Sequence, residues 1–278
     1  MTARLLLAAA VVILSVAAGC GSSGTRWRFS RDAGVRIENA VSAEAVERPD
    51  GSIVLYVNSP RGIEAYRSED GLSFRRRRGR MPFGAHPTVV RLRDGRLRMY
   101  YATPDDPPII PSHLRSASSR DGYVWFLEDG ARFADIGFGV MEVVPLPDGT
   151  WRLYYNDRRL DGTSRILSAR STRGLTFHLE SGVRLPAPYV DPAVVRLGSG
   201  EWLMAVSTIE QGRRQRIYLA ESKDGLRWKV EPRPLVDDVG ASDFDPTLLA
   251  LGRGRYRIYY TRSRGTLFEL LSGIVSAS

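Results

Sequence analysis

Cysteine and histidine are scarce in this sequence. The 278 residues include one cysteine, Cys20, and three histidines. A single thiol excludes a disulfide within the chain, and so few ligands of the zinc type give no metal-binding spacing. The sequence also has no glycine-rich phosphate-binding loop and no GxSxG nucleophile motif. We therefore expect neither a metal nor another cofactor.

Lysine is nearly absent as well. Of the 40 lysines and arginines only Lys223 and Lys229 are lysines, and the formal net charge is +9. The arginines are scattered along the chain except for the run from Arg75 to Arg78, which is more typical of a solvated strand end than of a nucleic-acid site. We predict no nucleic-acid partner. A basic face beside an anionic surface or an acidic glycan remains an alternative.

Long apolar runs are absent apart from one at the N-terminus. Arg4 is followed by LLLAAAVVILSVAA, which ends in Ala17-Ala18-Gly19-Cys20. A positive residue, a short apolar stretch and small residues before a cysteine are typical of a secretory signal, and the closing residues resemble a bacterial lipobox. We predict a lipoprotein signal peptide over residues 1–20 and lipidation of Cys20 with palmitate. The acyl chains would then be the only attachment to a membrane.

This interpretation places the protein in the cell envelope after export. Gly21 is not the aspartate that retains a lipoprotein at the inner membrane, so an outer-membrane location is expected if the organism is Gram-negative. Residues 21–278, in a chain that is 43% hydrophobic, are enough for one large domain with a substantial core. We expect this domain to be a monomer.

A segment with one pattern recurs five times between residues 42 and 261. Each copy is a short apolar run, a polar turn with a glycine, and a run in which polar residues alternate with Leu, Met or Tyr. The pattern predicts a β-hairpin, and a repeat of about fifty residues with several strands is typical of propeller blades. The copies are SAEAVERPDGSIVLYVN (Ser42 to Asn58), HPTVVRLRDGRLRMYYA (His86 to Ala102), VMEVVPLPDGTWRLYYN (Val140 to Asn156), DPAVVRLGSGEWLMAVS (Asp191 to Ser207) and DPTLLALGRGRYRIYYT (Asp245 to Thr261).

A second motif separates the copies and predicts the turn between the third and fourth strands of a blade, with an aromatic residue that returns to the core. It occurs as SEDGLSF (Ser68 to Phe74), SRDGYVWF (Ser119 to Phe126), STRGLTF (Ser171 to Phe177) and SKDGLRW (Ser222 to Trp228). Five hairpins need a fifth such turn, and residues 24–27 match residues 225–228. We predict an all-β, five-bladed β-propeller with four antiparallel strands per blade. Its N-terminal strand closes the last blade beside the C-terminal strand.

The starts of the inner strands surround the axial funnel of a propeller, where ligands bind. Two positions of each copy face this axis, the first and the third. The first positions are Ser42, His86, Val140, Asp191 and Asp245, and the third positions are Glu44, Thr88, Glu142, Ala193 and Thr247. Carboxylates are costly to bury unpaired, so we expect them to face a wet cavity or arginines. Asp before Pro also caps a turn well, and this alternative stays open for Asp191 and Asp245.

Tyrosines occur in pairs on three of the predicted second strands. These pairs are Tyr100-Tyr101, Tyr154-Tyr155 and Tyr259-Tyr260. Because successive side chains on a strand point to opposite sides, we interpret the pairs as packing within and between blades rather than as sugar-stacking surfaces. The residues after one pair, 156–159, include Arg158, which is a candidate rim ligand for an acidic or hydroxylated substrate.

The five blades, the Asp-Pro starts and the SxDGxxW turns resemble the five-bladed glycosidases, namely glycoside hydrolase families 43, 32 and 117 and the related family 130 phosphorylases. The resemblance covers nearly all of the chain after the signal. In the family 43 pattern an Asp of the first blade is the general base, an Asp of the third orients, and a Glu of the fourth is the general acid. The matching positions here carry Ser42, Val140 and Asp191. The expected base is therefore absent.

The resemblance implies a protein that hydrolyses or binds carbohydrate, or another small polar ligand, in its axial funnel. Glu142, Asp191 and Asp245 are the candidate catalytic residues of a glycosidase that would use paired carboxyl groups. The candidate substrate-binding residues are Glu44, His86 and Arg158. His86 could donate a proton, although a histidine before proline is also a common turn residue. The alternative is a non-catalytic propeller that binds surface glycans or proteins, or serves as a scaffold, after loss of the base.

Overall fold

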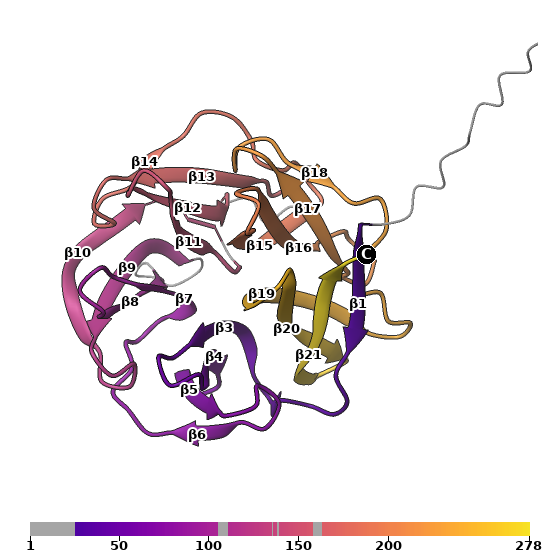
Figure 1. Ribbon diagram of the computed structural model, residues 1–278, viewed down its shortest axis with the longest axis horizontal. Coiled ribbons are helices and arrows are strands. Elements are labelled where there is room, and N and C mark those ends of the chain that lie inside the picture. Colours follow the sequence, from indigo (N-terminus) through magenta and orange to yellow (C-terminus); the bar gives the residue numbers. More distant parts are fainter. Residues whose placement is uncertain (1–25, 105–110, 135, 138, 158–162) are drawn as a thin grey trace, which may run out of the picture.

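Five antiparallel β-sheets surround one central axis (Figure 1). The computed structural model describes residues 26–104, 111–134, 136–137, 139–157 and 163–278. Each sheet is one blade. Four of the blades have four strands in sequential order from the axis outward, and the fifth is completed by strands from the N-terminal end, which confirms the predicted five-bladed propeller. Within the described residues no helix is long and apolar enough to cross a membrane.

The blades are built from the following strands. Blade 1 consists of β3 (Val41–Glu47), β4 (Ile53–Ser59), β5 (Gly62–Ser68) and β6 (Arg75–Arg77). Blade 2 consists of β7 (Ala85–Arg91), β8 (Leu97–Pro104), β9 (Pro111–Ser119) and β10 (Phe126–Ala134). Blade 3 consists of β11 (Glu142–Pro145), β12 (Trp151–Asn156), β13 (Ile166–Ser171) and β14 (His178–Leu179). Blade 4 consists of β15 (Tyr189–Arg196), β16 (Trp202–Thr208), β17 (Ile217–Ser222) and β18 (Lys229–Val230).

Blade 5 joins the two ends of the chain. It contains β19 (Ser242–Gly252), β20 (Arg255–Arg264), β21 (Leu267–Ala277) and, as its outermost strand, β1 (Trp27–Arg31), while the short β2 (Ile37–Glu38) also pairs with β21. β1 runs antiparallel to β21, with Trp27 opposite Ala277. The N-terminal strand therefore closes the ring as predicted, and blade 5 gains backbone hydrogen bonds that an open edge would leave unmade.

Tyrosine side chains from four of the five blades hold the turn of the next blade. The hydroxyl groups of Tyr56, Tyr100, Tyr154 and Tyr259 donate to the carbonyl oxygens of Gly122, Gly174, Gly225 and Gly71 at 2.7–3.0 Å. The aromatic residue three positions after each of these glycines packs edge-to-face on the same tyrosine, as Trp125 does on Tyr56 with ring centroids 5.6 Å apart. These contacts confirm the packing interpretation of the tyrosines and the architectural role of the turn motif.

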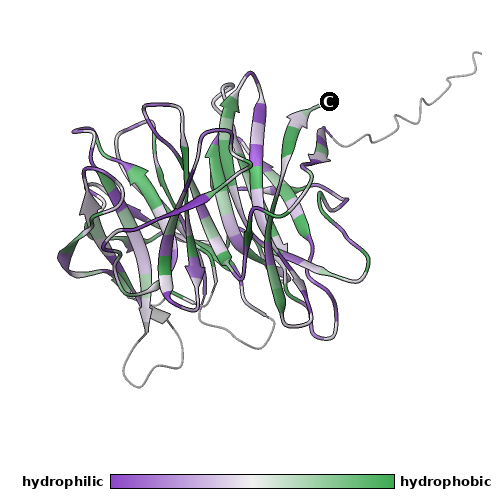
Figure 2. Ribbon diagram, turned by 90° about the horizontal axis from the view of Figure 1, so that it is seen from below, coloured by the Kyte–Doolittle hydropathy of each residue, from purple (hydrophilic) through white to green (hydrophobic). Residues whose placement is uncertain are grey.

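The propeller has two distinct faces. The four strands of a blade alternate in direction, so the chain returns to its starting face before the next blade begins. Every inner strand therefore begins on the same face, which we call the mouth face, and ends on the opposite one. β19 and β21 run the same way, so Ala277 and its partner Trp27 lie on the face opposite the mouth. Figure 2 shows the C-terminus at this opposite face. The described chain thus enters and leaves on the side away from the axial residues.

Candidate functional site

The first residue of four sequence repeats adopts a left-handed backbone conformation. Ser42, His86, Asp191 and Asp245 have φ values between 50° and 56°. Each lies in a β-bulge, where the pairing of the inner strand with its neighbour shifts, for example between Val41 and Glu44. A non-glycine residue with positive φ is uncommon and is sustained only where surrounding contacts fix it. The bulges therefore turn these four side chains into one polar ring, the upper ring, at the mouth.

Polar residues at the end of the neighbouring blade's second strand fix the bulges. The amide of His86 donates to Asn58 Oδ1 at 3.2 Å, and that of Asp191 to Asn156 Oδ1 at 3.0 Å. The amide of Asp245 donates likewise to Ser207 Oγ at 3.1 Å. Sequence reasoning missed this role. The signal was present, since the copies of the repeat that precede these three residues all end in a polar residue.

A continuous chain of hydrogen bonds runs through the upper ring. Ser42 Oγ donates to Asp245 Oδ2 at 2.6 Å, and His86 Nδ1 lies 3.1 Å from the same hydroxyl. The side chains of Asp245 and Asp191 are hydrogen-bonded to each other. Asp191 Oδ1 also accepts from the amide of Val140 at 3.0 Å and from Asn156 Nδ2 at 3.2 Å. The structure therefore brings His86, Asp191 and Asp245 together.

Burial determines the protonation of this chain. It raises the pKa of Asp191 to about 6 and that of Asp245 well above its ordinary value, with the charge of Asp191 as a further cause for Asp245. Two adjacent carboxyl groups cannot both ionise at ordinary cost, so burial and mutual repulsion favour a proton shared by the pair. Burial also lowers the pKa of His86 to about 4, which leaves a neutral imidazole. The upper ring is thus less charged than its composition indicates.

Ser42, His86 and Asp245 have the residue types of a nucleophilic triad but not its order. In a triad the histidine lies between the serine and the aspartate, takes the serine proton and is oriented by the carboxylate. Here the serine hydroxyl lies between the other two and donates its hydrogen bond directly to Asp245 instead of to the histidine. Ser42 is also only 1% exposed. This arrangement cannot activate the hydroxyl as a nucleophile.

A second ring, the lower ring, lies one step deeper and ties the inner strands together. Glu44 Oε1 accepts from the amide of Val89 at 2.9 Å, and Glu142 accepts from Thr88 Oγ1 at 2.9 Å and from the amide of Val194. Thr247 Oγ1 donates to Glu44 Oε2 at 3.1 Å. Each contact joins two different blades. Glu44 and Glu142 therefore have a structural role in the ring, whatever else they do.

Both glutamates are buried, and burial is the largest cause of their shifted acidity. It raises the pKa of Glu44 to about 7 and that of Glu142 well above the usual range, with the charge of Glu44 as a further cause for Glu142. Among the described residues, their hydrogen-bond donors lie on neighbouring strands, and neither glutamate forms an ion pair with an arginine. Within the described part of the chain, no group of three or more His, Cys, Asp or Glu side chains is suited to hold a metal ion.

The separation of the carboxyl groups bears on the chemistry. Retaining glycosidases hold two carboxyl groups about 5–5.5 Å apart and inverting ones about 6.5–9.5 Å apart. The side chains of Asp191 and Asp245 interact directly with each other, which is the contact of a coupled carboxyl pair rather than of two groups that flank a sugar. Two of the predicted residues, Arg158 and Cys20, lie outside the described residues.

The fold matches solved structures along most of its length. A thermostable family-43 glycoside hydrolase has a TM-score of 0.66 at 16% identity over 87% of this chain and 91% of that one. An endo-arabinase from Bacteroides thetaiotaomicron VPI-5482 has a TM-score of 0.67 at 15% identity, and the match covers 88% of this chain and 98% of that one. The chain shares the fold of the five-bladed glycosidase propellers. No protein-family model matches the sequence, and no curated protein matches it.

The glycosidase propeller fold is not restricted to one reaction. An N-acetylgalactosamine deacetylase from F. plautii, in complex with blood group B trisaccharide, has a TM-score of 0.67 at 12% identity over 90% of this chain and 93% of that one. At such identities the likeness concerns the fold alone. Any reaction must therefore be argued from the rings of this chain.

Proposed function

We propose that the protein is an exported, lipid-anchored propeller that binds carbohydrate on its mouth face without hydrolysing it. One observation carries the choice between binding and hydrolysis. The acids of the axis are hydrogen-bonded to one another and to neighbouring strands, and each is at least nine-tenths buried. Ser42, at the position where the family 43 pattern has its base, donates a hydrogen bond to Asp245. The carbohydrate class rests on the named ligands and substrates of the neighbours in fold.

The lipid anchor is supported by the sequence of the first 20 residues and by the geometry of the described ends. Arg26 is the sixth residue after Cys20, a stretch that reaches about 20 Å at most. Trp27 lies on the face opposite the mouth. An acyl chain on Cys20 would therefore hold that face toward the membrane and turn the mouth outward. A Cys20→Ser variant should lose palmitate labelling and leave the membrane fraction, and unchanged labelling would contradict the anchor.

A glycan array and a broad chromogenic-glycoside panel test the binding function. The full chain in non-ionic detergent is expected to retain at least one glycan and to release no reducing ends from it. A matched variant, Glu47→Gln, changes an exposed acid of the same inner strand that carries Glu44 and should bind equally. If the protein were retained on none of the glycans, carbohydrate binding would be rejected.

Hydrolysis is the second candidate, and the proton shared by Asp191 and Asp245 favours it. A protonated carboxyl group beside an ionised one is a pair with the protonation states of a general acid and a general base. If the pair is catalytic, Asp191→Asn should lower turnover about a hundredfold or more while the protein stays folded. Turnover by the wild-type protein that disappears in this variant would replace the binding proposal with hydrolysis.

A further inference from the structure

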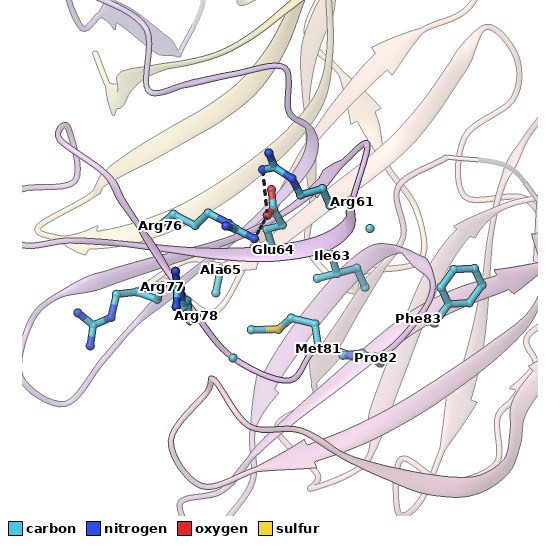
Figure 3. Close-up of a pocket in the computed structure, with 12 residues that line it drawn as sticks. Arg61, Ile63, Glu64, Ala65, Arg76, Arg77, Arg78, Met81, Pro82 and Phe83 are labelled. Atoms are coloured by element: carbon cyan, nitrogen blue, oxygen red, sulfur yellow. Dashed lines mark ion pairs between the residues drawn. The ribbon is translucent and has the colours of Figure 1, made fainter.

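Four arginines line one cavity at the outer edge of blade 1. The cavity has a volume of about 470 Å³, within the range of small-molecule sites. It lies between β5, β6 and the segment that crosses to blade 2, as Figure 3 shows. Its arginines are Arg61, from the turn before β5, and the three consecutive residues Arg76, Arg77 and Arg78. Arg61 and Gly62 belong to the mouth end of the blade.

The positive charge of this cavity is only partly neutralised. Glu64 is its one acidic residue, and Arg76 and Arg61 both pair with it, at 2.5 and 3.7 Å (Figure 3). Arg77 lies over the ring of Tyr123, with its guanidinium carbon 5.6 Å from the ring centre. The Arg78 side chain makes no hydrogen bond or ion pair with the described residues. Four cations and one anion leave three positive charges, which a bound anionic group would offset.

An exposed aromatic ring lies at the same cavity. Phe83 is 84% exposed, although an aromatic side chain ordinarily contributes to a core. It is two residues before β7 and three before His86 of the upper ring, so it stands on the mouth face between the cavity and the axis. The face of an aromatic ring carries partial negative charge and attracts the C–H groups on the flat side of a pyranose. Sequence reasoning took the arginine run as a solvated strand end and did not single out Phe83.

We propose that this cavity binds an anionic sugar unit, a uronate or a sulfated residue, of a glycan that continues across Phe83 toward the mouth. Arginine forms paired hydrogen bonds with carboxylate and sulfate groups, and Phe83 supports the sugar ring. The inference rests on the proposed carbohydrate function and specifies its substrate class. An extended nucleic-acid strand fits less well, because the four arginines surround a single cavity rather than follow a strip of surface.

Calorimetry on the full chain in non-ionic detergent tests the proposal. The probes are polygalacturonate oligosaccharides and the same oligosaccharides with their carboxyl groups reduced to alcohols. The acidic probe should bind at least about tenfold more tightly than the neutral one, and this advantage should shrink as salt is added. Arg78→Gln should remove most of the advantage, whereas Arg78→Lys, which keeps the charge, should retain part of it.

Two further variants separate the parts of the site. Phe83→Ala should weaken binding of both probes several-fold, and Phe83→Tyr should bind as the wild type does. Arg227→Gln is the matched control, because Arg227 is 93% exposed on the opposite face, in the turn before β18. It should leave both affinities unchanged.

The outcomes distinguish this inference from the proposed function. Equal affinity for acidic and neutral oligosaccharides would overturn the anionic subsite and leave carbohydrate binding intact. Binding of neither probe, together with a blank glycan array, would overturn both. If inorganic phosphate or vesicles rich in anionic lipid bound at Arg78 while the acidic sugar did not, the cavity would be an anion site of another class and the proposal would be wrong.

Discussion

Replacing Glu44 with glutamine should stabilise the propeller at neutral and alkaline pH. Burial raises the pKa of this carboxyl group from the usual 4.5 to about 7, so the folded state holds the proton more tightly than the unfolded state does. The stability contributed by the proton is fully present below about pH 4.5 and is lost as the pH rises through about 7. A pKa difference of about 2.5 corresponds to a loss of about 3 kcal/mol in the free energy of unfolding.

Glutamine reproduces the protonated acid. Its carbonyl oxygen can accept from the amide of Val89, and its NH₂ group can donate to Thr247 Oγ1, which takes the place of the hydroxyl-to-carboxylate bond at 3.1 Å. The variant therefore keeps the contacts between blades while removing the buried charge. At about pH 5 it should match the wild type, and at about pH 8 it should be more stable by about 2–3 kcal/mol.

Urea denaturation followed by tryptophan fluorescence, from about pH 5 to about pH 8, measures this difference. The wild-type protein should keep losing stability in this range, because Asp191, Asp245 and Glu142 also have raised pKa values. Glu47→Gln, on the exposed end of the same strand, is the control for a simple change of net charge. If Glu44→Gln lost as much stability as the wild type over the range, the buried-charge account of the lower ring would be wrong.

Two further substitutions test the contacts that hold the blades. Tyr154→Phe removes the hydrogen bond of 2.7 Å to the buried Gly225 carbonyl and leaves that oxygen only the longer bond of 3.2 Å from Trp228 Nε1. The free energy of unfolding, measured by urea denaturation, should fall by about 0.5–1.5 kcal/mol. Arg262→Met leaves the fully buried carboxylate of Asp243 without its paired bonds at 2.7 and 3.1 Å, and should lower the free energy of unfolding by about 3–5 kcal/mol. The double variant with Asp243→Leu should recover most of this loss in the same assay. No recovery would contradict the unpaired-charge explanation.

The architecture could be predicted from the sequence because it depends on local periodicity. Glycine turns, alternation along the strands and an aromatic residue after each Asp-Gly turn repeat five times, and each repeat specifies one sheet. The closing strand could be predicted for the same reason. Trp27 occupies the place in blade 5 that the match between residues 24–27 and 225–228 indicated.

The sequence also predicted which residues surround the axis, since the first and third positions of each repeat meet there. Their chemistry could not be foreseen. Asp191 and Asp245 are 54 residues apart, and only the ring brings their carboxyl groups into contact and makes them share a proton. The left-handed bulges that aim them depend on Asn156 and Ser207 of neighbouring blades. Pattern alone gives neither the contact nor the protonation.

The sequence by itself thus determined the number of blades, their closure and the identity of the axial positions, because these follow from repetition along the chain. Only the tertiary structure decided that Ser42 lies between His86 and Asp245, that Glu44 and Glu142 tie strands together, and that Phe83 stands beside the arginine cavity. Hydrogen bonding and burial depend on which blades meet. That information exists only once the ring has closed.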